Sequence, residues 1–118
     1  MDRVGYLEKI ADSKGKEQIN NILQYAKYLQ QIEADESIRQ SKRALKLCRE
    51  LGFGQWEIYC LFHLGYAYYY NQDLNQAESI ADEVLKLSES LGNKEDEVEF
   101  KINYPYKKIT SKGERSVI

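Results

Sequence analysis

Residues 85–92 read LKLSESLG, and residues 45–52, which lie 40 positions earlier, read LKLCRELG. At the same offset Tyr28 meets Tyr68 and Glu17 meets Glu57, and apolar residues replace one another where the identity is lost. A period of this length is typical of proteins built from stacked helical hairpins, because it holds two helices and their turns. The sequence therefore predicts two copies of one hairpin.

Apolar residues within each copy recur every three to four positions, which is the spacing of one helix face. The first copy is expected to form helices over residues 17–31 and 34–51, and the second copy over residues 55–70 and 74–91. Gly52 and Gly92 follow the second helix of each copy, where a glycine supplies the left-handed residue that ends a helix. A further short helix is predicted over residues 2–11.

These elements predict an all-α fold, an α-α superhelix of two antiparallel helical hairpins with short flanking helices. The expected domain covers residues 1–103, with units at 12–51 and 52–91 and a partial third helix at 94–103. Pro105 ends that helix, because proline lacks the backbone donor and clashes with the preceding turn. Residues 104–118 are basic and are expected to form a disordered tail.

Leu64-Gly65, Tyr68, Ala77 and Ala81 resemble the sequence pattern of the tetratricopeptide repeat. Leu61 stands where that family often has tryptophan, and Glu89 stands where a proline would close the repeat. The period is also 40 rather than 34 residues, which implies longer helices. Long units of this kind resemble those of bacterial signalling and transcription-regulating proteins.

The resemblance implies that the first helix of each unit lines a concave surface. Carried onto this sequence, the partner-binding positions are Tyr59, Phe62, Tyr66, Tyr69 and Tyr70 in the second unit and Ile19, Ile22 and Leu29 in the first. Tyrosine joins a large apolar ring to a polar tip, which suits a half-wet binding surface. These residues are expected to form an apolar and aromatic groove for a peptide or a helix, although the same pattern also fits simple core packing.

Signatures of catalysis and of metal or cofactor binding are missing from the sequence. It has no phosphate-binding glycine loop, no HExxH segment and no paired Cys/His motif. The only histidine, His63, has no evident nucleophile beside it, and we interpret it as a packing or surface residue. Cys48 and Cys60 are interpreted as small buried residues in reduced form. We therefore expect no enzyme activity, no cofactor and no metal.

Charge gives little sign of a nucleic-acid or membrane partner. The formal net charge is −2, and no apolar run approaches the roughly 20 residues of a membrane helix. One helix does carry a basic stripe of Arg39, Lys42, Arg43, Lys46 and Arg49. The stripe fits a nucleic-acid contact, a solvated outer face, or ion pairs with Asp82 and Glu83 in the next unit. We favour the solvated face and a cytoplasmic protein that binds neither nucleic acid nor membrane.

The sequence thus favours a protein–protein or peptide interaction module, an adaptor or regulatory component of signalling. Two alternatives stay open. The chain could be a structural domain that forms homo-oligomers through its aromatic face. It could also be a fragment of a larger repeat-containing protein with a diguanylate cyclase, kinase or transcription-regulating domain.

Overall fold

The computed structural model describes residues 1–91, 107–109 and 115–117. Residues 1–91 form five helices in sequence order: α1 (Arg3–Ala11), α2 (Gly15–Leu29), α3 (Ala34–Leu51), α4 (Trp56–Tyr70) and α5 (Leu74–Leu91). The all-α prediction is confirmed for this part of the chain. The expected helices at 34–51 and 74–91 have the predicted ends, whereas α2 begins and ends two residues earlier than expected.

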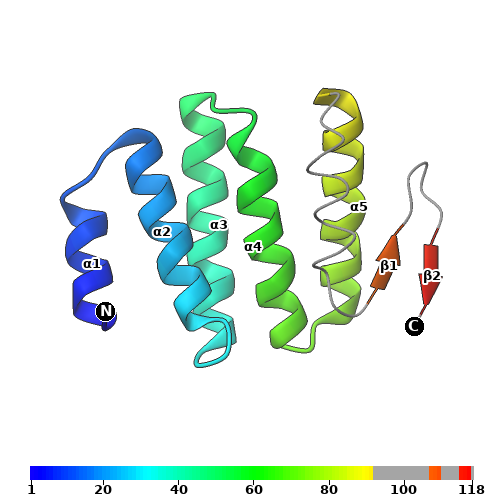
Figure 1. Ribbon diagram of the computed structural model, residues 1–118, viewed down its shortest axis with the longest axis horizontal. Coiled ribbons are helices and arrows are strands. Elements are labelled where there is room, and N and C mark those ends of the chain that lie inside the picture. The colour runs from blue at the N-terminus through cyan, green and yellow to red at the C-terminus, as the bar shows by residue number, and fades with distance from the viewer. Residues whose placement is uncertain (92–106, 110–114, 118) are drawn as a thin grey trace.

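The helices lie side by side in sequence order, and each packs on the one before it and the one after it (Figure 1). An additional contact joins α2 and α4, the first helices of the two hairpins. Helix α4 is therefore the central element, since it meets α2, α3 and α5. The region next to α4 is where residues from both sequence copies come together.

A residue with positive φ follows the end of both α3 and α4. Gly52 has φ of +76° after α3, and the Phe53 amide donates to the Cys48 carbonyl over 3.1 Å. After α4 the left-handed residue is Gln72, with φ of +64°, and the Asp73 amide donates to the Tyr68 carbonyl over 2.9 Å. Both turns reverse the chain tightly enough for neighbouring helices to pack antiparallel.

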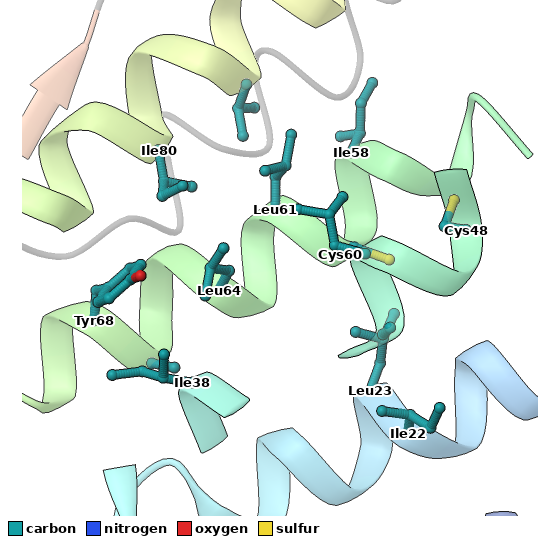
Figure 2. Packing of buried hydrophobic residues seen from close by; sticks show 14 of the residues in the cluster. Ile22, Leu23, Ile38, Cys48, Ile58, Cys60, Leu61, Leu64, Tyr68 and Ile80 are labelled. Atoms are coloured by element: carbon teal, nitrogen blue, oxygen red, sulfur yellow. The ribbon is translucent and has the colours of Figure 1, made fainter. Parts of the chain in front are cut away.

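The hydrophobic core runs through all five helices. Figure 2 shows side chains of α2, α3, α4 and α5 meeting around α4. The largest side chains without any appreciable exposure are Ile19, Ile22, Leu29, Ile58, Leu61 and Val84. At the N-terminal end, Tyr6 of α1 stacks on Tyr25 of α2 and packs at a tilt against Tyr28, with ring centroids 5.7 and 5.0 Å apart. These rings attach α1 to the first hairpin.

Two short strands, β1 (Lys107–Ile109) and β2 (Arg115–Val117), pair antiparallel, with Lys108 opposite Ser116. They lie in the segment for which the sequence predicts a disordered tail. The local reason is that both triplets contain β-branched residues, which favour extended backbone. The expected third helix at 94–103 lies outside the described residues.

Candidate binding face

Helix α4 has no charged face. Seven of its residues are buried against neighbouring helices, namely Ile58, Cys60, Leu61, Leu64, Gly65, Ala67 and Tyr68. The other half of its circumference carries Trp56, Tyr59, Phe62, His63, Tyr66, Tyr69 and Tyr70. A helix that is apolar all round is normally enclosed by protein. The aromatic half of α4 is nevertheless partly open to solvent, so we take it as the candidate functional site.

The sequence-predicted aromatic residues of α4 do share one face and do reach solvent. Tyr59 is 43% exposed and Tyr70 is 39% exposed, while Phe62, Tyr66 and Tyr69 are half-buried. The rings contact one another along the helix. Trp56 and Tyr59 have centroids 5.8 Å apart in an edge-on arrangement, and Tyr59 and Phe62 follow at 6.5 Å. At the other end Tyr69 and Tyr70 lie 5.4 Å apart. Trp56, Tyr59 and Phe62 thus form one group of neighbouring rings on this face, and Tyr69 and Tyr70 form a second.

Ile19, Ile22 and Leu29 do not line this face. Each has an exposed fraction of 0%, so the expectation that they form the first-unit part of an open groove is wrong. The physical reason is a change of offset within the repeat. In the first hairpin, the amide of Glu33, the residue before α3, donates to the Leu29 carbonyl. In the second hairpin, the amide of Asp73, the residue before α5, donates to the Tyr68 carbonyl.

Four residues thus separate Leu29 from Ala34, the first residue of α3, whereas five separate Tyr68 from Leu74, the first residue of α5. The second helices of the two hairpins begin 40 residues apart, whereas the buried residues of the first helices correspond at an offset of 39: Ile19 with Ile58, Ile22 with Leu61, Ala26 with Gly65 and Leu29 with Tyr68. The first-unit counterparts of Tyr59, Tyr66 and Tyr70 are thus Asn20, Lys27 and Gln31 rather than Ile19, Ala26 and Gln30. Asn20, Lys27 and Gln31 are all exposed.

These counterparts, together with Gln24, form a polar row on α2 that the sequence analysis missed. Their spacing is the signal that could have found them, because positions i, i+4, i+7 and i+11 share one helix face. The row lies beside the aromatic face. The Gln31 Nε2 atom donates to the Tyr70 hydroxyl over 3.4 Å, and Gln30, Gln31 and Tyr70 line one shallow recess.

His63 lies at the junction of the polar row and the aromatic face. Burial, with the Lys27 ammonium on α2 as a second cause, lowers the pKa of His63 to about 4. Its Nδ1 atom is buried and has no hydrogen-bond partner. The imidazole is therefore neutral at pH 7, and it adds no charge to the face.

The two cysteines are free and have exposed fractions of 0%. The Cys48 thiol donates to the Phe53 carbonyl over 2.9 Å. Burial, with the neighbouring Cys48 thiol as the next cause, raises the pKa of Cys60 to about 12. Thiols in this state are not nucleophiles. Within the described residues no three His, Cys, Asp or Glu side chains gather where a metal ion could bind.

The basic stripe of α3 is matched by carboxylates at both ends. Arg39 pairs with Glu36 at 2.6 Å and with Asp35 at 3.4 Å on its own helix. Arg49 reaches Glu57 on α4 at 3.2 Å and Glu83 on α5 at 3.0 Å. The structure thus shows an ion pair between the two hairpins, made by Arg49 at the end of the stripe. In between, the Lys42 ammonium lies 5.7 Å from the centre of the Tyr68 ring.

Comparison with known proteins gives no relative for this chain, since no family model, curated protein or solved structure matches it. None of the helices among the described residues combines the length and apolar character needed to cross a membrane.

Proposed function

We propose that this protein is a tetratricopeptide-like interaction module that binds another polypeptide through the aromatic face of α4. The observation that carries the proposal is the row of rings from Trp56 to Tyr70. It is partly exposed on the central helix of the fold, where a surface helix would normally carry charges. Aromatic residues are the side chains most often responsible for affinity at protein interfaces.

Helix packing supports the repeat architecture within this proposal. Contacts run α1 to α2, α2 to α3, α3 to α4 and α4 to α5, and α2 also contacts α4. This is the order expected when helical hairpins stack and their first helices form one layer. In such a stack the layer of first helices offers an extended surface, and here that layer consists of α2 and α4.

Binding rather than catalysis is the activity that the face supports. Its residues offer ring surfaces, hydroxyls and amides, and the one histidine is neutral and lacks a partner at Nδ1. These groups recognise a ligand but supply no nucleophile–base pair. The role that we propose, an adaptor or regulatory component, requires binding alone.

The test compares the wild-type chain with a Tyr59→Ala/Tyr70→Ala double variant in affinity capture followed by mass spectrometry. These two rings are the most exposed of the face, so the variant should keep its helical circular dichroism. Val4→Ala is the matched control, because Val4 is 60% exposed but lies on α1. Each captured protein is then purified and its affinity measured directly.

We expect a partner whose affinity falls at least tenfold in the double variant and is unchanged by Val4→Ala. Partners that bind all three proteins equally would refute the proposal. Light scattering over a range of concentrations tests the structural alternative, because a mass that rises with concentration and falls in the double variant would indicate a homo-oligomer through this face.

A further inference from the structure

The turns of the two hairpins lie at the same end of the helix stack (Figure 1). The turn between α2 and α3 contains Ile32, which is 59% exposed, and the turn between α4 and α5 leads into Leu74, which is 47% exposed. Tyr70, the last residue of α4, is 39% exposed at this end. Turns are normally built of polar residues, glycine and proline. We call the surface formed by these three apolar side chains the turn edge.

Tyr70 joins the two turns into one surface. Its hydroxyl accepts a hydrogen bond from the Gln31 Nε2 atom over 3.4 Å. Ile32 and Tyr70 line one shallow recess, and Tyr70 and Leu74 line a second. The two recesses are therefore neighbours that share the Tyr70 ring. Single apolar side chains are ordinary on a protein surface, whereas a contiguous apolar patch is often a binding site.

The charge around the turn edge is negative. Residues 28–38 and 64–85 contain no lysine or arginine. The Glu33 carboxylate of the first turn pairs with Arg3 of α1. In the second turn, the Asp73 carboxylate accepts from the Asn71 side chain over 2.8 Å and is in no ion pair within the described part of the chain. An uncompensated carboxylate thus lies next to Leu74, where it would attract a basic partner.

The backbone donors of both turns are already used. The amides of Ile32, Glu33, Gln72 and Asp73 donate to carbonyls at the end of the preceding helix over 2.8 to 3.0 Å. An extended segment needs partners for its own N–H and C=O groups, whereas a helix pairs these groups internally. The turn edge therefore suits a helix, which would contact it through side chains alone.

The size of the turn edge disfavours a second copy of this chain as the occupant. A free tyrosine side chain exposes on the order of 200 Å², and the two aliphatic side chains expose less. At exposed fractions of 39–59%, the three together offer roughly 300 Å² at most. A standard stable interface uses about 800 Å² per partner. One face of a short helix is small enough, and its residues i and i+4 lie about 6 Å apart, which suits two neighbouring recesses.

We propose that the turn edge binds a short amphipathic helix of a partner protein. Two apolar side chains of that helix, one turn apart, pack on Ile32, Tyr70 and Leu74, and a lysine or arginine beside them faces Asp73. This surface goes beyond the proposed function, because Ile32 and Leu74 belong to neither α2 nor α4.

The experiment uses a display library of 16-residue, alanine-rich helical peptides in which positions i, i+3, i+4 and i+7 of one face are randomised. Peptides are selected on the wild-type chain after removal of those that bind an Ile32→Ser/Leu74→Ser variant. Circular dichroism first checks that this variant keeps its helix content. Leu51→Ser is the matched control, because Leu51 is 44% exposed and ends α3 at the other end of the stack.

We expect enrichment of peptides with two apolar residues four positions apart and a neighbouring Lys or Arg. Their affinity should fall at least tenfold in the Ile32→Ser/Leu74→Ser variant and stay unchanged in Leu51→Ser. Asp73→Asn removes the charge and keeps the shape of the side chain. It should lower the affinity about two- to fivefold in low salt, and less in 0.5 M NaCl.

Three outcomes would overturn the inference: a selection without enrichment, selected peptides that lack basic residues and ignore Asp73→Asn, and selected peptides that Tyr59→Ala weakens as much as the turn-edge variant does. The last result would assign the peptides to the aromatic face of α4, and would thus leave the proposed function standing. Failure of the proposed function itself appears separately, in the capture experiment with Tyr59→Ala/Tyr70→Ala.

Discussion

The Ser37 hydroxyl of α3 donates a 2.6 Å hydrogen bond to the backbone carbonyl of Ala26 on α2. Both residues are completely buried, so the bond lies at a point where the two helices approach closely. The second hairpin has Gly65 and Ala77 at the corresponding places, and they too are buried. Small residues recur where the helices of each hairpin pack together, and Ala26 and Gly65 are 39 residues apart, as are the other buried residues of the first helices.

Replacing Ser37 should weaken the first hairpin. Ser37→Ala is expected to lower the free energy of unfolding by about 1 kcal/mol, because a buried carbonyl loses its partner. Ser37→Leu should cost about 1–3 kcal/mol more, since the closely packed helices must separate. Urea unfolding followed by circular dichroism measures both. Ser79→Ala, at an exposed site on α5, is the control, and equal stability of all four proteins would contradict the packing described here.

The buried position of Ile22 leads to a second prediction. Ile22→Ala should lower the free energy of unfolding by about 2–5 kcal/mol, because it leaves a cavity in the core. Tyr59→Ala should cost less than about 1 kcal/mol, since this ring is 43% exposed. Urea unfolding of the two variants and the wild-type chain measures both losses of unfolding free energy. A small loss of unfolding free energy for Ile22→Ala would indicate that Ile22 lies in the surface groove that the sequence pattern suggested, and not in the core.

The neutral state of His63 should make stability depend on pH. Its pKa is about 4 in the folded protein, against 6.5 for a free imidazole. Between these values the unfolded chain binds more protons, so stability falls as the pH drops from 6.5 towards 4. The loss from this residue is about 2 kcal/mol at pH 4.5, and it should vanish in His63→Gln.

The measurement for His63 is the urea midpoint of both proteins between pH 7 and pH 4.5. Both proteins contain the same carboxylates, so the difference between the two curves reports the contribution of His63 alone. Parallel curves would show that the imidazole is not held neutral by the fold.

Arg49 joins three helices, but its ion pairs should contribute little stability. The Arg49 side chain is 48% exposed, as is Glu83, and exposed pairs contribute about 0–1 kcal/mol. Arg49→Gln should therefore lower the free energy of unfolding by less than about 1 kcal/mol in low salt, and by less still in 0.5 M NaCl. Lys46→Gln is the control on the same helix. A loss that persists in high salt would mean that Arg49 acts through packing instead.

Much of the local structure follows from the sequence alone. The second helices at 34–51 and 74–91 are fixed by apolar residues at helical spacing, and Gly52 ends the first of them because glycine adopts positive φ without a steric cost. The aromatic character of α4 is also a local property, since side chains three and four positions apart share a face. These features depend on near neighbours along the chain, which the sequence lists directly.

Only the tertiary structure decided which residues lie beside that face. One extra residue between Tyr68 and the start of α5 shifts the correspondence of the first helices, so Ile22 lies in the core rather than in the expected groove and Gln31 reaches Tyr70. A helix rotates by about 100° per residue, so a shift of a single position exchanges buried and exposed sides. The sequence by itself determined the helices and their repeat. The contacts across α2 and α4, which depend on how separate helices are rotated against each other, came from the folded chain.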